Sequence, residues 1–246
     1  MRKRLGAVTC ALVSLLLGGC ATSPGLSPEL AARPGFAELA NQPSVLDVYD
    51  PLEGLNRGVY KFNAVFDRYL FLPAVRAYEI VTPEFVQERI SDFFSNLTEP
   101  FSFANSLLQG KGARAGRAAT RFIVNTMFTA GFFDLAGARG VEQEREDFGQ
   151  TLGVWGVDKG PYLVLPVFGP SNFRDAAGLG ATGATYFFAV PTGVSGSIPY
   201  KLTTYVLWPI DTRHQIKFRY YETGSPFEYE LVRLIYTEKR ELDIAN

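Results

Sequence analysis

The stretch GLNRGVYKFNAVFDRYL, residues 54–70, decides the fold class. At about 100° per residue, its apolar side chains fall on one face of a helix and its polar side chains fall on the other. The apolar face holds Leu55, Val59, Phe62, Val65, Phe66, Tyr69 and Leu70, and the polar face holds Asn56, Arg57, Lys61, Asn63, Asp67 and Arg68. This pattern predicts an amphipathic helix with a broad apolar face, which Pro73 should end.

Helical periodicity continues through most of the remaining chain. Thr82, Pro83 and Glu84 are typical of a helix start, with Thr82 as the N-cap. We expect further helices at about residues 84–97, 99–109, 112–129, 203–207, 211–221 and 226–243. Alternation of the β-strand type is scarce, so the predicted fold class is all-α.

Residues 131–175 are dense in glycine and proline and interrupt this pattern. We expect an ordered loop with short helical turns, and a loop of this length is usually functional. An acidic run within it, formed by Glu142, Glu144, Glu146 and Asp147, is expected to be solvated and not to form an acid–base pair.

Residues 1–19 have the layout of a secretory signal, with Arg2, Lys3 and Arg4 before an apolar stretch. That stretch is too short to remain as a membrane-spanning helix. Its ending, Leu-Gly-Gly-Cys20, resembles the lipobox of bacterial lipoproteins, in which the cysteine becomes the acylated first residue. An ordinary signal that ends by chance in cysteine is the alternative. Ala21, in place of the Asp that favours inner-membrane retention, points to the outer membrane.

Composition divides the chain into three expected parts: a signal peptide at 1–19, a lipidated flexible tether at 20–46 and a helical domain at 47–246. Export would remove three of the 24 basic residues and none of the 25 acidic ones, which leaves a net charge of −4. This charge speaks against a nucleic-acid partner. Aromatic residues make up 14% of the chain, more than its core needs, so some are expected to face lipid.

The residues offer little for catalysis. His214 is the one histidine and is expected at the surface, and Cys10 would leave with the signal, so we expect neither a metal site nor a cofactor. A Gly-x-Ser-x-Gly elbow and a phosphate-binding glycine loop are both missing from the sequence. The sequence therefore predicts a protein that is not an enzyme.

A basic stripe lies on the helix expected at 112–129. Lys111, Arg114, Arg117 and Arg121 fall within about a third of its circumference. Such a stripe is often only a solvated face, but on a membrane protein it can also hold phospholipid head groups, because Arg and Lys pair well with phosphate. The second interpretation predicts that Arg114, Arg117 and Arg121 line a head-group path, and that reversing their charge weakens the outer-membrane barrier without lowering the protein level.

The order of motifs along residues 50–175 resembles that of the MlaA (VacJ) lipoproteins. The resemblance begins with DPLEGLNR at residues 50–57 and continues through NLTEP at 96–100, DFGQTLG at 147–153 and RD at 174–175, with weaker similarity at 211–213 and 233–236. The family-motif positions are Asp50, Pro51, Asn56, Arg57, Asn63, Asn105, Arg121, Asn125, Asp134, Gly149, Gly153, Gly156, Tyr162, Pro166, Arg174 and Asp175.

This resemblance implies a ring of amphipathic helices, anchored through Cys20, in the periplasmic (inner) leaflet of the outer membrane. An amphipathic channel through the ring would remove glycerophospholipids that have strayed into the outer leaflet. The implied partners are an outer-membrane trimeric porin and the periplasmic lipid-carrier protein of the Mla pathway. For Asp50, Asn56, Arg57 and Asn63, polar contacts within the ring and direct lipid contacts both stay open.

Two other functions also fit the residues. The apolar helix faces are also compatible with an ordinary helical core, in which case the protein would be a lipoprotein scaffold that spaces envelope proteins. A phospholipase is the third candidate, although no nucleophile–base pair supports it.

Overall fold

A computed structural model describes residues 48–246 of the chain. Cys20, the signal peptide and the tether lie outside these residues, so the division at 19 and 46 stays a prediction. Helix α4 (Glu53–Phe66) confirms the helix expected at residues 54–70. It does not end at Pro73, because a π-helical segment, η1 (Asp67–Phe71), joins it to α5 (Leu72–Val81). Pro73 lies in the first turn of α5, a position where proline is tolerated.

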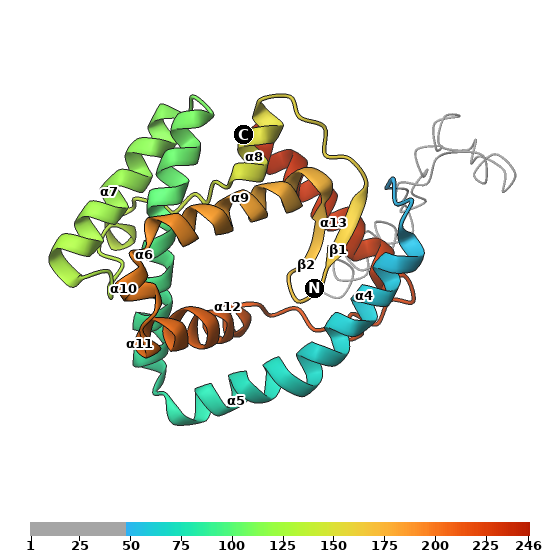
Figure 1. Cartoon of the computed structure of the whole chain (residues 1–246), viewed down its shortest axis with the longest axis horizontal. Coiled ribbons are helices and arrows are strands. Elements are labelled where there is room, and N and C mark those ends of the chain that lie inside the picture. The colour runs from blue at the N-terminus through green and yellow to red at the C-terminus, as the bar shows by residue number, and fades with distance from the viewer. Residues whose placement is uncertain (1–47) are drawn as a thin grey trace, which may run out of the picture. The chain divides into compact units, whose positions relative to one another are not determined.

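The next two helices form a hairpin (Figure 1). Helix α6 (Glu84–Leu108) covers two of the expected helices, since Pro100 lies inside it and does not break it. Its N-cap is Pro83, and not Thr82 as predicted; the Thr82 carbonyl instead accepts a hydrogen bond of 2.6 Å from the Gln87 side chain. Helix α7 (Gly112–Thr129) has the predicted bounds and ends where Ala130 turns left-handed, at a φ of 52°.

The Gly/Pro-rich segment is more ordered than the sequence predicts. It contains η2 (Gly137–Arg139), α8 (Phe148–Val154) and an antiparallel hairpin of β1 (Tyr162–Leu165) and β2 (Gly169–Asn172). Strands of four residues are too short to show a clear alternation, so the sequence pattern missed them. The last part of the chain holds α9 (Phe173–Ala189), α10 (Thr192–Ser195), α11 (Ile198–Leu202), η3 (Thr203–Leu207), α12 (Trp208–Gln215) and α13 (Glu228–Ala245).

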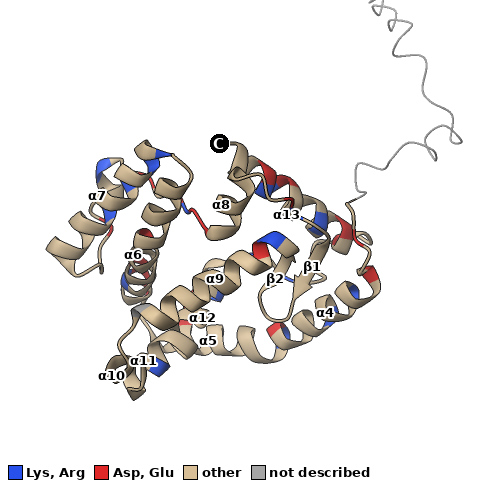
Figure 2. Ribbon diagram, turned by 45° about the horizontal axis from the view of Figure 1, so that its top comes forward, with Lys and Arg blue, Asp and Glu red and all other residues tan. Residues whose placement is uncertain are grey.

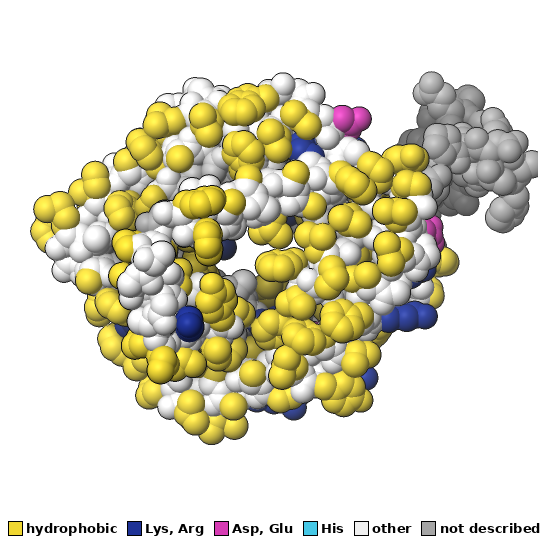
Figure 3. Space-filling view, in the orientation of Figure 1, with side chains coloured by type: hydrophobic (Ala, Val, Ile, Leu, Met, Phe, Trp, Pro, Cys, Tyr) yellow, Lys and Arg dark blue, Asp and Glu magenta, His cyan; other side chains and the backbone are white. Residues whose placement is uncertain are grey.

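Within residues 48–246, the elements follow one another around a central opening (Figure 1). Helices α9, α6 and α12 border it on one side, and the β-hairpin and α4 border it on the other. The opening persists when side chains are drawn in full, as Figure 3 shows. The predicted all-α ring is therefore confirmed, with the small sheet as an addition. No helix in this part of the chain is both long and apolar enough to cross a membrane.

Burial in this ring is inverted relative to that of most water-soluble domains. Among residues 48–246, 23 polar or charged residues are buried, against ten hydrophobic ones. In the same part of the chain, 37 large hydrophobic residues are exposed. The apolar core is small and centres on Tyr60, Tyr162, Val164 and Tyr229, where α4, β1 and α13 meet. Polar contacts must therefore hold much of the ring together.

Candidate functional site

Asn56 joins α4 to the β-hairpin through its fully buried amide group. Its Nδ2 donates to the Tyr162 carbonyl at 3.1 Å, and its Oδ1 accepts from the Val164 N–H at 2.9 Å. The amide thereby satisfies backbone groups along one edge of β1. A further hydrogen bond of 2.7 Å, from Nδ2 to the Asp50 carboxylate, fixes the side chain. Of the two roles left open for Asn56, these contacts support the polar contact within the ring.

Asp50 and Arg57 join the start of the ring to its last helix. The Asp50 carboxylate accepts from the Tyr229 hydroxyl at 2.5 Å and from Arg233 at 3.1 Å, both on α13. Arg57 pairs with Glu230 on the same helix and stacks over the Tyr229 ring at 4.3 Å. These two motif positions therefore close the ring, while Pro51 lies exposed in the turn before α4.

Asn63 holds the turn of the hairpin in a strained conformation. Its Nδ2 donates to the Leu165 carbonyl at 3.0 Å, and its Oδ1 accepts from the Val167 N–H at 2.7 Å. Val167 has a φ of 71°, and a β-branched residue in this region costs roughly 1–3 kcal/mol. Pro166 and Phe168, on either side of it, are exposed. These two hydrogen bonds, one donated and one accepted by Asn63, explain how the turn keeps this conformation.

Arg121 is buried between α6 and the loop that follows α7. Its guanidinium donates to Glu99 at 2.6 Å, to Asp134 at 2.9 Å and to the Val141 carbonyl at 2.5 Å. Asn125 donates to the same Asp134 carboxylate at 3.0 Å. Three family-motif positions, Arg121, Asn125 and Asp134, thus form one polar cluster that ties the α6–α7 hairpin to the loop that follows α7.

The two carboxylates of this cluster respond differently to burial. Burial raises the pKa of Glu99 and outweighs the opposing hydrogen bond from Arg121. Burial also acts to raise the pKa of Asp134, but hydrogen bonds from the Gly137 N–H, Arg121 and Asn125 hold it below its ordinary value. The negative charge of Glu99 therefore depends on the guanidinium beside it.

The rest of the basic stripe faces the acidic run. Arg114 pairs with both Glu144 and Glu146, Arg117 pairs with Glu144, and Lys111 lies 3.6 Å from Glu146. Glu146 is only 4% exposed, so the prediction of a solvated acidic run is wrong for this residue, whereas Glu142 is exposed as predicted. Each arginine of the predicted head-group path has a carboxylate partner within the ring. The path itself stays a prediction, and any phosphate would have to compete with these carboxylates.

A second polar cluster joins α8, α9 and α13. Arg240 donates to both oxygens of Asp147, at 2.7 and 2.9 Å, and to Asp175 at 2.8 Å. Asp175 also accepts from the Tyr236 hydroxyl at 2.7 Å. Burial acts to raise the pKa of Asp175, but the hydrogen bond and charge of Arg240 hold it below its ordinary value. Arg174 is buried beside it, with its Nε 3.2 Å from the Asp175 carboxylate.

The motif glycines let helices approach one another closely. Gly149 lies against Gly178, where α8 packs on α9, and a Cβ built at Gly153 would meet the Ile244 side chain at 2.6 Å. Gly156 follows the end of α8 with a φ of 86°.

The motif residue Asn105 joins α6 to α8, because its side-chain oxygen accepts a hydrogen bond of 2.8 Å from the Thr151 hydroxyl.

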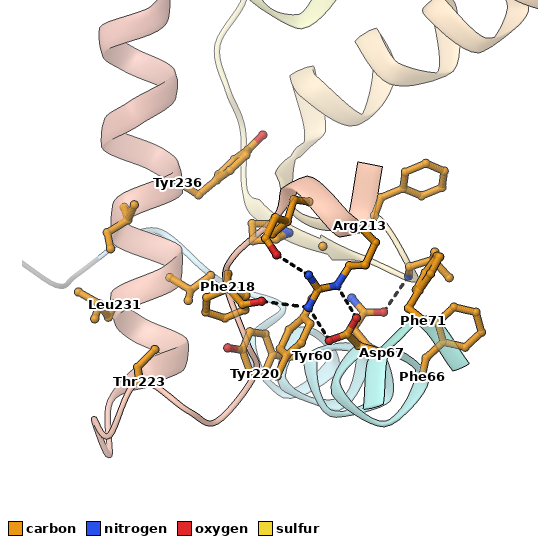
Figure 4. Close-up of a pocket in the computed structure, with 18 of the residues that line it drawn as sticks. Tyr60, Phe66, Asp67, Phe71, Arg213, Phe218, Tyr220, Thr223, Leu231 and Tyr236 are labelled. Carbon is orange, nitrogen blue, oxygen red and sulfur yellow. Dashed lines mark hydrogen bonds and ion pairs between the residues drawn. The ribbon is translucent and has the colours of Figure 1, made fainter. Parts of the chain in front are cut away.

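A cavity of about 430 Å³ lies between α4, the hairpin turn and α13. Its wall is mainly aromatic and aliphatic, and Figure 4 shows Phe218 and Tyr220 beside α13, from which Tyr236 projects. We call it the aromatic cavity. Its lining residues are Tyr60, Asn63, Phe66, Asp67, Phe71, Val167, Phe168, Gly169, Pro170, Arg213, Ile216, Phe218, Tyr220, Thr223, Leu231, Val232, Ile235, Tyr236 and Lys239. Of the sixteen family-motif positions, Asn63 alone lines it. The segments of weaker similarity at 211–213 and 233–236 also contribute, through Arg213, Ile235 and Tyr236.

His214 and Asp211 lie together at the junction of α12 with α5 and α6. His214 is partly exposed, and its Nδ1 lies 2.8 Å from Glu79 on α5. Asp211 is fully buried and accepts hydrogen bonds from Ser91 at 2.6 Å and from Gln215 at 2.8 Å. Burial raises the pKa of Asp211 despite these hydrogen bonds.

We predict that Asp211→Asn stabilises the ring at neutral pH. The pKa of the Asp211 carboxyl is higher in the folded protein than in the unfolded chain. Ionisation of this group therefore favours the unfolded chain, and this penalty grows as the pH rises above about 4. The variant lacks this penalty. Thermal unfolding measured across pH should show a gain that grows from about pH 4 towards neutrality. An equal gain at every pH, or a loss, would contradict the prediction.

The comparisons with known proteins agree on one family. A family model described as MlaA lipoprotein matches residues 48–243. A Haemophilus influenzae protein named intermembrane phospholipid transport system lipoprotein MlaA is 34% identical over 187 residues, which cover 74% of this chain and 73% of that protein. The Escherichia coli protein of the same name is 37% identical, over 68% of this chain and 66% of its own length.

Two further comparisons extend this result. An uncharacterized Rickettsia felis protein is 40% identical over 136 residues, so this chain spans about half the length of that relative, 54%. A solved structure described as the structural basis for maintenance of bacterial outer membrane lipid asymmetry has a TM-score of 0.65 and 31% identity. It covers 80% of this chain and is itself covered completely. The chain therefore belongs to the MlaA lipoprotein family.

Proposed function

We propose that this protein transports phospholipids at the outer membrane and so maintains the asymmetry of its two leaflets. In this function it removes mislocalised phospholipid from the outer leaflet through the opening of the ring and breaks no covalent bond. Two named relatives belong to an intermembrane phospholipid transport system, and the solved relative is described in terms of outer-membrane lipid asymmetry.

The inverted burial of the ring is the observation that carries this proposal. Large exposed apolar surfaces mark contacts with membranes or proteins, because water does not solvate them well. Buried polar clusters such as Arg121–Glu99–Asp134 hold the ring together without needing an apolar interior. A ring built in this way suits an apolar solvent outside and polar groups inside.

The distribution of charge supports the same placement. No charged residue occurs between Asp175 and Lys201, the segment that forms most of α9, all of α10 and the start of α11. Figure 2 shows this uncharged region apart from the charges on α7 and α13. Phe187 and Phe188 are 77% and 82% exposed within it. We propose that these apolar surfaces lie in the periplasmic leaflet, with the acyl chains on Cys20 anchoring the ring there.

The partners follow from the same proposal. A trimeric porin would hold the ring in the outer membrane, and a periplasmic lipid-carrier protein would receive the extracted lipid. Phospholipid is the ligand that passes from the ring to the carrier. Arg114 and Arg117 remain the candidates for head-group contact, because they are more exposed than Arg121.

The experiment measures outer-leaflet phospholipid in cells that lack the gene and in cells that carry Cys20→Ala. We expect more outer-leaflet phospholipid in both, because without the ring, or without its anchor, lipid is not removed. The wild-type gene supplied in trans is the control and should restore asymmetry. Unchanged asymmetry in both strains would refute the transport function and favour a scaffold. Fatty acid released from phospholipid by the purified protein would instead indicate a phospholipase.

A further inference from the structure

The aromatic cavity presents almost no polar group for a ligand to bind. Its size falls within the range of about 300–1,000 Å³ that is usual for small-molecule pockets. Ile216 and Ile235, which line it, are 46% and 55% exposed, so apolar surface remains open here. A ligand that fills this space would cover that surface.

The charged groups in the wall are already paired with each other. Arg213 donates to both oxygens of Asp67, at 2.5 and 2.8 Å, as the dashed lines in Figure 4 show. Two of its other three N–H groups donate to the carbonyls of Ile216, at 2.7 Å, and Phe218, at 2.9 Å. Because the donors and the carboxylate satisfy one another, a polar ligand would lose water here and gain no partner. The wall of the cavity therefore favours binding of a hydrocarbon chain over binding of a polar ligand.

The edge of the cavity differs from its interior. Lys239 lines it from α13, and its side chain is 70% exposed. Its ammonium lies 2.5 Å from Asp243, a surface ion pair of the kind that contributes little to stability. A phosphate can therefore replace that carboxylate at low cost. An apolar interior with a cation at its edge complements an acyl chain that carries an anionic head group.

We propose that the aromatic cavity binds one acyl chain of a phospholipid, with its phosphate beside Lys239. This inference rests on the proposed transport function and adds a position within the ring where one chain of the lipid leaves the membrane.

Photolabelling tests this position directly. The full lipidated protein is placed in vesicles of phosphatidylethanolamine and phosphatidylglycerol, in which part of the phosphatidylglycerol carries a diazirine at the end of one acyl chain. After illumination, the labelled peptides are identified by mass spectrometry. We expect label on Phe218 and Leu231, which line the cavity and are only partly exposed, in addition to label on the exposed outer surface.

Two matched variants on α13 separate the cavity from the surface. Ile235→Trp places a larger side chain in the cavity and should lower labelling of Phe218 about tenfold, as overfilled pockets do. Leu242→Trp is the control, because Leu242 is similarly exposed, at 62%, but does not line the cavity. Leu231→Trp serves as a second cavity variant if Ile235→Trp does not fold.

The outcomes are distinct. Label in the cavity that Ile235→Trp removes and Leu242→Trp keeps supports the proposal. Label confined to surface residues such as Ile80 and Phe187 overturns it and leaves the transport function intact. Cavity label that appears only in Cys20→Ala assigns the cavity to the protein's own anchor and also overturns the proposal. No label anywhere, together with unchanged asymmetry in cells that lack the gene, overturns both.

Discussion

Replacing Gly178 by alanine is expected to destabilise the protein by about 3 kcal/mol, the upper part of the range for overpacked sites. A Cβ at this position would lie 2.4 Å from the Gly149 nitrogen and 2.7 Å from its Cα. These are backbone atoms, so α8 and α9 would have to move apart. That movement would also disturb the hydrogen bonds from Arg240 to Asp147 and Asp175. These hydrogen bonds join α8 and α9 to α13.

Gly180→Ala is the matched control for this prediction. Gly180 is exposed on the same helix, and a Cβ there would meet nothing within 4 Å. Alanine should stabilise the helix at that position by about 1 kcal/mol, because it has the higher helix propensity. Urea unfolding in detergent, followed by circular dichroism, measures both variants. Equal stability of the two variants would show that the close approach of the helices does not limit this site.

Replacing Arg121 by methionine is expected to cost about 3–5 kcal/mol, the usual loss when one partner of a buried ion pair is removed. The Glu99 side chain is 1% exposed and its charge relies on this guanidinium. Asp134 would at the same time lose the hydrogen bond that it accepts from Arg121. Charge reversal at Arg121 should therefore lower the protein level, which differs from the expectation that the sequence gives for the whole basic stripe.

Two further variants test whether burial of the pair is the cause. Arg117→Met removes a partly exposed arginine of the same helix, at 39% side-chain exposure, and should cost only about 0–1 kcal/mol. Glu99→Gln combined with Arg121→Met removes the unpaired charge and should recover part of the loss. Chemical unfolding measures all three variants. If Arg121→Met and Arg117→Met are equally stable, the cluster does not support the hairpin as we describe.

The helices could be predicted from the sequence because their apolar periodicity is strong. Residues 54–70 and 112–129 both carried this pattern and both are helical. Prediction failed where the structure overrides local rules. Pro73 and Pro100 lie within long helical runs. Helix α9 carries three glycines, Gly178, Gly180 and Gly183, which weaken any helical signal although one of them is required for packing.

The candidate site was harder to predict, because its contacts join distant residues. The sequence places Arg114, Arg117 and Arg121 on one face but says nothing of the carboxylates opposite them. Asp67 meets Arg213 across 146 positions, and no local pattern encodes that pairing. The order of motifs singled out candidate residues, whereas the structure was needed to find their hydrogen-bond partners.

The contacts of Asp50 have a consequence for how the protein folds. Its partners Tyr229 and Arg233 lie 179 and 183 positions further along the chain. Contacts of such separation raise the contact order and slow folding, because a long loop must close before they form. Helix α13 is also the last of the described elements to be synthesised. The α6–α7 hairpin can therefore assemble early, whereas the two ends of the ring can join only after α13 has been synthesised.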